Sequence, residues 1–61
     1  MNGYVRLKST DGQIVAINAD NVTYVIAYQK SDISSIVYFE KGNYVIVSGS
    51  VDEVISRLEN S

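Results

Sequence analysis

Few side chains in this sequence are of the kinds that carry out chemistry. The 61 residues include no His and no Cys, so the usual zinc ligands and the common pairing of a nucleophile with a His base are both missing. The nearest pair of carboxylates, Asp52 and Glu53, falls in the first turn of a predicted helix, where capping and the helix dipole account for both. We therefore expect no catalytic residue, no cofactor and no metal site, and predict that the protein is not an enzyme.

The other polar residues fit structural roles. Asp20 lies in Asn18-Ala19-Asp20-Asn21, a segment that favours a turn or one helical turn begun by an Asn or Asp cap. A metal ligand would need carboxylate neighbours, and Asp20 has none nearby in sequence. The four glycines are dispersed at turns and form no phosphate-binding loop. The elements that these turns connect are therefore the informative part of the chain.

Length and composition restrict the class of protein. A single domain of this size buries only about 60% of the surface of its unfolded chain. A core below about 70 residues rarely supplies more than about 3–5 kcal/mol, and without Cys or His the remaining reinforcement is a second subunit. The formal charge of −2 argues against a nucleic-acid partner. No apolar run reaches the roughly 18 residues of a membrane span, and no signal peptide begins the chain, so we expect a cytoplasmic protein.

The first part of the chain reads as a hairpin. Strands are predicted over residues 4–8 and 13–17, on either side of the turn Thr10-Asp11-Gly12. A three-residue loop with Gly in the left-handed conformation pairs Leu7 with Val15, whereas a two-residue turn pairs Leu7 with Ala16. We favour the three-residue loop, which also places Ser9 opposite Gln13.

Three further strands are predicted over residues 22–30, 34–39 and 44–48. The loop after the first of these has Ser31-Asp32 at its tip, and Glu40-Lys41-Gly42 is again a three-residue loop with Gly last. That loop pairs Tyr38 with Tyr44. Alternation then gives the sheet two apolar sides. One, the valine side, contains Val25, Ala27, Val37, Phe39, Val45 and Val47. The other, the Tyr/Ile face, contains Tyr24, Ile26, Tyr28, Ile36, Tyr38, Tyr44 and Ile46.

A helix is predicted over residues 51–59. Ser50 followed by Glu53 makes a capping box, and Arg57 in the last turn suits the helix dipole. One apolar stripe runs along the helix, formed by Val51, Val54, Ile55 and Leu58. The predicted fold class is α+β: a five-stranded antiparallel, meander-like sheet with the C-terminal helix packed on one side. The sequence leaves open whether the sheet curls toward a barrel.

One helix covers one side of a sheet. We expect it on the valine side, because small β-branched residues lie flat under an apolar stripe. The Tyr/Ile face is then an uncovered apolar surface, and such surfaces mark interaction sites.

The order of TDGQIVAIN, NVTYV, SIVYFEKGNYVIVSGS and VDEVISRL resembles small flagellar and swarming-motility proteins of the FlbD type. This resemblance implies a small bacterial protein with a strand, a turn Gly, a late hairpin and a closing helix. The segment from Ile17 to Leu58 is also similar to the last part of LytTR-type DNA-binding domains, with "I-N", "G" and "V-S" at comparable places. That second resemblance implies contacts with DNA through loop residues.

Three functions remain as hypotheses. The first is a non-enzymatic bacterial or phage interaction or regulatory module that acts as a homo-oligomer through the Tyr/Ile face, with another protein as a second option for the partner. The second is nucleic-acid binding through Arg6, Lys8 and tyrosine stacking. The third is binding of a small ligand at a subunit interface, with tyrosines as its walls.

Overall fold

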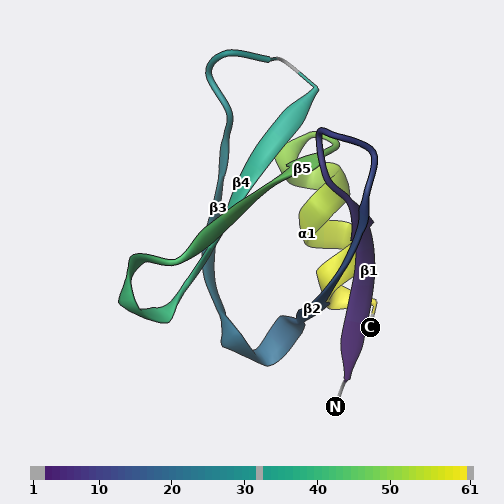
Figure 1. The fold of residues 1–61 in the computed structure, drawn as a ribbon. Coiled ribbons are helices and arrows are strands. Elements are labelled where there is room, and N and C mark those ends of the chain that lie inside the picture. Colours follow the sequence, from purple (N-terminus) through teal and green to yellow (C-terminus); the bar gives the residue numbers. More distant parts are fainter. Residues whose placement is uncertain (1–2, 32, 61) are drawn as a thin grey trace.

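The computed structural model describes residues 3–31 and 33–60. These residues form an α+β fold, as predicted, in which the strands are antiparallel and one helix ends the chain (Figure 1). The elements, in chain order, are β1 (Tyr4–Lys8), β2 (Ile14–Asn18), the 3-10 turn η1 (Ala19–Asn21), β3 (Val22–Ala27), β4 (Ser34–Phe39), the 3-10 turn η2 (Glu40–Gly42), β5 (Tyr44–Ser48) and α1 (Val51–Glu59).

The strands divide into two sheets, β1-β2 and β3-β4-β5, where the sequence suggested one. Between β2 and β3 lies η1, the helical turn that the sequence predicted. Asn18 caps this turn: its side-chain oxygen accepts a hydrogen bond from the Asp20 N–H at 3.0 Å. The sheets still meet at a single bridge between Ser9 and Val47, so the end of β1 lies beside β5.

Both hairpins with three-residue loops have the predicted register. Leu7 pairs with Val15 in the first hairpin, and Tyr38 pairs with Tyr44 in the second. The last loop residues, Gly12 and Gly42, have φ values of 92° and 79°, a left-handed conformation that costs glycine little. Since a slip of one residue would turn every side chain to the opposite side, these turns decide which residues enter the core.

The loop between β3 and β4 begins earlier in the chain than predicted. Strand β3 ends at Ala27 rather than at residue 30. The Tyr28 N–H still donates to the Ser34 carbonyl at 3.0 Å, but the Ser31 N–H donates back to the Tyr28 carbonyl at 3.1 Å and closes a turn. Asp32, predicted at the loop tip with Ser31, lies outside the described residues. Strand β2 is shifted by one residue from its predicted range.

Helix α1 begins with the predicted capping box. The Glu53 N–H donates to the Ser50 hydroxyl at 3.1 Å, and the Ser50 N–H donates to the Glu53 carboxylate at 2.8 Å. The helix contacts β1, β3 and β4. Val54, at 1% exposure, is the buried residue of its stripe.

The core lies between α1, the β1-β2 hairpin and the valine side of β3-β4-β5. The helix therefore covers the predicted side. Ser35 is a fully buried polar residue here, and its hydroxyl donates to the Gly49 carbonyl at 2.7 Å, which ties β4 to the turn before α1. Ala27, also on the valine side, is exposed. The buried apolar residues are Val5, Leu7, Ile17, Val37, Val47 and Val54, and Val15, Val25, Phe39, Val45 and Leu58 pack against them.

Candidate functional site: the Tyr/Ile face

The Tyr/Ile face lies on the side of β3-β4-β5 away from the core, and strand pairing orders its residues into two rows. Tyr24 pairs with Tyr38 and Tyr38 with Tyr44, which makes a tyrosine row across all three strands. Ile26, Ile36 and Ile46 make a parallel isoleucine row in the same way. Tyr28 follows β3, beside the start of β4.

No residue of this face is buried within one copy of the chain. Tyr24, Ile26 and Tyr44 are exposed at 53%, 43% and 60%, and the other four residues of the face are half-buried. Helix α1 lies on the opposite side of the sheet. The face therefore leaves large apolar side chains in contact with water.

The rings of the tyrosine row contact one another. Tyr24 and Tyr38 stack with their ring centroids 4.5 Å apart and their planes 16° apart, and Tyr38 and Tyr44 are 5.6 Å apart and tilted by 48°. A ring whose flat side rests on another ring has that side less available to a base or a planar ligand. A row of tyrosines combines apolar rings with polar hydroxyl groups, which suits contact with protein.

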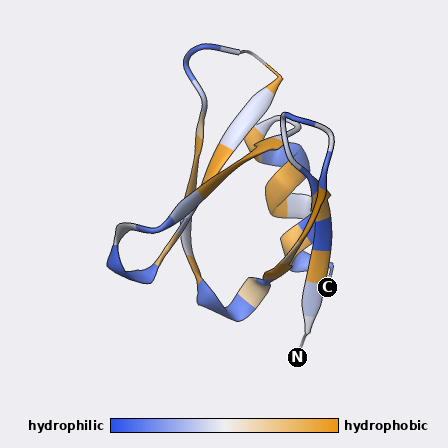
Figure 2. Cartoon of the chain, viewed as in Figure 1, coloured by the Kyte–Doolittle hydropathy of each residue, from blue (hydrophilic) through white to orange (hydrophobic). Residues whose placement is uncertain are grey.

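The strands that carry this face contain no charged residue. All five Lys and Arg and all seven Asp and Glu residues lie outside β3, β4 and β5. Figure 2 shows the hydrophilic colour gathered in the loops at both ends of the three-stranded sheet. The charged residues Glu40 and Lys41 are in the loop between β4 and β5, and Lys30 is in the loop between β3 and β4. Removing water from an uncharged sheet surface costs little free energy, because no charged group loses its hydration.

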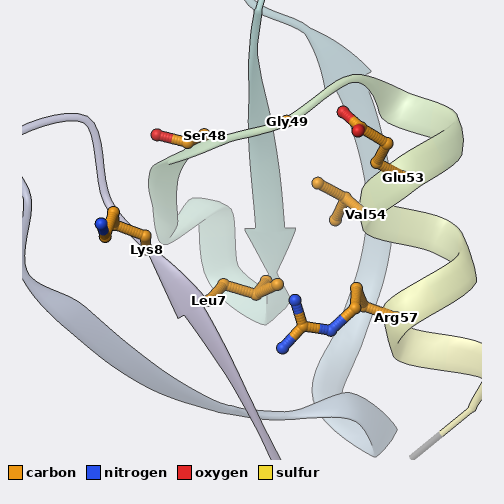
Figure 3. A pocket seen from close by; sticks show the side chains of 7 residues that line it. All are labelled: Leu7, Lys8, Ser48, Gly49, Glu53, Val54 and Arg57. Carbon is orange, nitrogen blue, oxygen red and sulfur yellow. The ribbon is translucent and has the colours of Figure 1, made fainter.

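A hollow between α1 and β1 is the other feature considered as a site (Figure 3). Its volume is about 240 Å³, below the roughly 300–1,000 Å³ of most ligand pockets. Leu7 and Val54 line it with Lys8, Glu53 and Arg57. The Arg57 guanidinium donates to the Arg6 carbonyl at 2.6 Å, so it holds the end of α1 against β1. A groove of about 340 Å³ also runs between the β1-β2 turn and β5, with Tyr44 and Ile46 on one wall.

Exposed apolar residues also occur outside the Tyr/Ile face. Ile14 is 61% exposed and Tyr4 69% exposed on the β1-β2 hairpin, and Ile33 is 73% exposed before β4. The alternation of β1 and β2 places Ile14 on the same side as Arg6 and Lys8, so its surroundings are charged. Ile33 was not predicted as part of either side of the sheet, because it follows a loop and belongs to no alternating pattern.

Among the residues that the structure describes, Asp11 has a shifted pKa, and it belongs to a turn. Hydrogen bonds from the Ser9 hydroxyl and the Gln13 backbone lower the pKa of Asp11 below its ordinary value. Asp11 therefore stabilises the β1-β2 turn as a carboxylate. Within the described residues no group of three or more Asp, Glu, His or Cys side chains is placed to hold a metal ion.

Comparison with protein-family models, with curated proteins and with solved structures finds no match to this chain. Over residues 3–31 and 33–60, no helix has both the length and the apolar character needed to cross a membrane. The physical features of the Tyr/Ile face are therefore the basis for the functional argument.

Proposed function

We propose that this chain is a small non-enzymatic interaction or regulatory module that works as a homo-oligomer, with a second copy covering the Tyr/Ile face. The observation that carries the proposal is the tyrosine and isoleucine rows on three strands without a charged residue. The resemblance to FlbD-type proteins suggests a bacterial or phage setting and a cytoplasmic location.

A second copy suits this face on electrostatic grounds. The chain carries a net charge of −2, so two copies repel each other weakly wherever their charged surfaces meet. Contact through the Tyr/Ile face brings two uncharged surfaces together and leaves the charged loops and α1 in water. Tyr is enriched at protein interfaces because its ring is buried there while its hydroxyl still finds a polar partner.

The size of the core supports the same proposal. Of the described residues, six apolar ones are buried: Val5, Leu7, Ile17, Val37, Val47 and Val54. A core this small gives a marginal domain, and burial of the second apolar side by association adds the kind of stabilisation that disulfides or metals provide elsewhere. The mutual stacking of Tyr24 and Tyr38 favours a protein contact over stacking on nucleic-acid bases.

Sedimentation equilibrium of the wild type and of Tyr24→Lys with Tyr38→Lys tests the proposal. The wild type is expected as a dimer or larger assembly that dissociates on dilution. The double variant is expected as a folded monomer, because charged ammonium groups cannot be buried unpaired at the interface. Circular dichroism checks that the variant is folded.

The matched control replaces two exposed isoleucines away from the face, Ile14→Lys with Ile33→Lys, and so adds the same charge. This control is expected to assemble as the wild type does. A wild type that sediments as a monomer at high concentration, or a tyrosine variant that assembles like the control, contradicts the proposal.

A further inference from the structure

One backbone edge adjoining the Tyr/Ile face is unpaired in the described chain. Strand β3 hydrogen-bonds β4 on one side and has no strand on the other. The Tyr28 N–H donates to the Ser34 carbonyl, and bonding alternates along an antiparallel strand. The backbone N–H and C=O groups of Tyr24 and Ile26 therefore hydrogen-bond to β4. Those of Val25 and Ala27 point away from β4, along the open edge.

This edge lacks most of the features that keep edge strands apart. Proteins protect such edges with Lys, Pro, inward charges or bulges. The segment from Val22 to Ala27 contains no charge, and the sequence contains no Pro. A bulge is present at Thr23, where the register shifts, and the Thr23 hydroxyl donates to the Tyr38 carbonyl at 3.1 Å. From Tyr24 onward the edge is regular and open.

The Tyr/Ile face is small for a standard protein interface. Its seven residues are well short of the about 20–30 residues that each partner contributes to a standard interface. A second contact between copies would enlarge the interface, and the β3 edge is contiguous with the face, because Tyr24 and Ile26 belong to both.

We propose that β3 pairs with β3 of a second copy, antiparallel, about a two-fold axis at Ile26. This inference rests on the proposed function, since the occupant is another copy of the same chain. In this register Val25 exchanges hydrogen bonds with Ala27 of the second copy, Tyr24 lies opposite its Tyr28, and the Thr23 bulge stays outside the paired segment. The N–H and C=O groups of Val25 and Ala27 that point away from β4 are then hydrogen-bonded in both copies.

The edge contact and the face contact involve different neighbours, so together they build a four-subunit assembly. Edge pairing joins two three-stranded sheets into one of six strands and doubles the area of the Tyr/Ile face. Two such sheets then pack with these faces together. Both contacts are two-fold and self-complementary, which allows the assembly to close rather than grow into a fibre.

Cysteine cross-linking tests the register, because the natural sequence contains no Cys. Residues opposite each other at a non-hydrogen-bonded position have Cα atoms about 4.5 Å apart, within the range that a disulfide spans. Ile26→Cys is expected to give a disulfide-linked dimer on mild oxidation, nearly complete under native conditions and absent in denaturant. Ala16→Cys, exposed in the middle of β2 on the other open edge, is the matched control and is expected to stay unlinked.

A second variant tests the edge without a cysteine. Ala27→Pro removes an N–H that points away from β4, a position where an edge strand tolerates Pro. Sedimentation of this variant should then give a dimer in place of the wild-type tetramer, because only the contact through the Tyr/Ile face remains. A wild-type tetramer with linked Ile26→Cys supports the inference. A wild-type dimer, or linking of Ala16→Cys in place of Ile26→Cys, overturns the β3 pairing and leaves the proposed function standing. A monomeric wild type overturns both.

Discussion

Tyr24 and Tyr38 stack across β3 and β4 immediately beyond a bulge in β3. The pairing runs from Val22 opposite Phe39 to Tyr24 opposite Tyr38, so Thr23 is the extra residue on β3. The pair of Tyr24 and Tyr38 continues the register of Ile26 with Ile36, so the bulge lies outside the tyrosine row and shifts only the partner of Val22. Within that regular pairing the two ring centroids are 4.5 Å apart.

The stack predicts energetic coupling between the two tyrosines. In a double-mutant cycle with Tyr24→Ala and Tyr38→Ala, we expect an interaction energy of about 0.5–1.5 kcal/mol. Urea unfolding at one fixed protein concentration measures it, since assembly makes stability depend on concentration. The same cycle with Tyr4→Ala and Tyr38→Ala is the control and should give a value near zero. Equal coupling in both cycles contradicts the stacked geometry.

Burial of Val54 predicts that its side chain contributes much of the packing of α1 against the core. Val54→Ala removes two buried methyl groups at a site with 1% exposure, and the lost transfer energy plus the cavity should cost about 2 kcal/mol. Ser56→Ala, at an exposed position of α1, should change the free energy of unfolding by less than about 0.5 kcal/mol. A loss at Val54 no larger than that at Ser56 shows that the helix is not packed on the valine side.

The capping box predicts the effect of Ser50→Ala. Loss of the hydroxyl that accepts from the Glu53 N–H should cost about 1 kcal/mol, and Ser50→Asp should retain most of the stability because Asp is also a good cap. Thermal unfolding followed by circular dichroism compares the two variants. If both are equally destabilised, the cap is not what stabilises the start of α1.

The lowered pKa of Asp11 predicts a pH dependence with a definite sign. Because the folded-state pKa lies below the ordinary value, the contribution of Asp11 is present above that value and is lost as pH falls through the folded pKa. NMR titration of the carboxyl group should give a pKa below about 3.9, and Ser9→Ala should raise it, since the Ser9 hydroxyl is the main cause. No change in the pKa of Asp11 on Ser9→Ala contradicts this assignment.

The parts of the fold that local chemistry determines could be predicted from the sequence. Gly12 and Gly42 at the ends of three-residue loops set both hairpin registers, and the registers set which residues share the Tyr/Ile face. Ser50 and Glu53 marked the start of α1. In these cases a turn or cap acts over a few residues, so a short segment contains the information.

The division into two sheets could not be predicted in this way. The capped turn at Ala19–Asn21 was predicted, but whether the strands on its two sides share one sheet depends on contacts between residues distant in the chain. The burial of Ser35 was also missed, because its hydrogen bond goes to Gly49, a residue distant in the chain. The bulge at Thr23, which shifts the pairing of Val22, likewise has no strong local signal.

The most direct test of the account is an NMR experiment on a sample that mixes isotope-labelled and unlabelled copies, in which contacts between copies are detected selectively. We predict contacts from the ring protons of Tyr38 and Tyr44 in one copy to the methyl groups of Ile36 and Ile46 in another. Contacts between copies that involve Ile14 or Ile33 instead, or none at a concentration where the protein is assembled, would contradict the claim that a second copy covers the Tyr/Ile face.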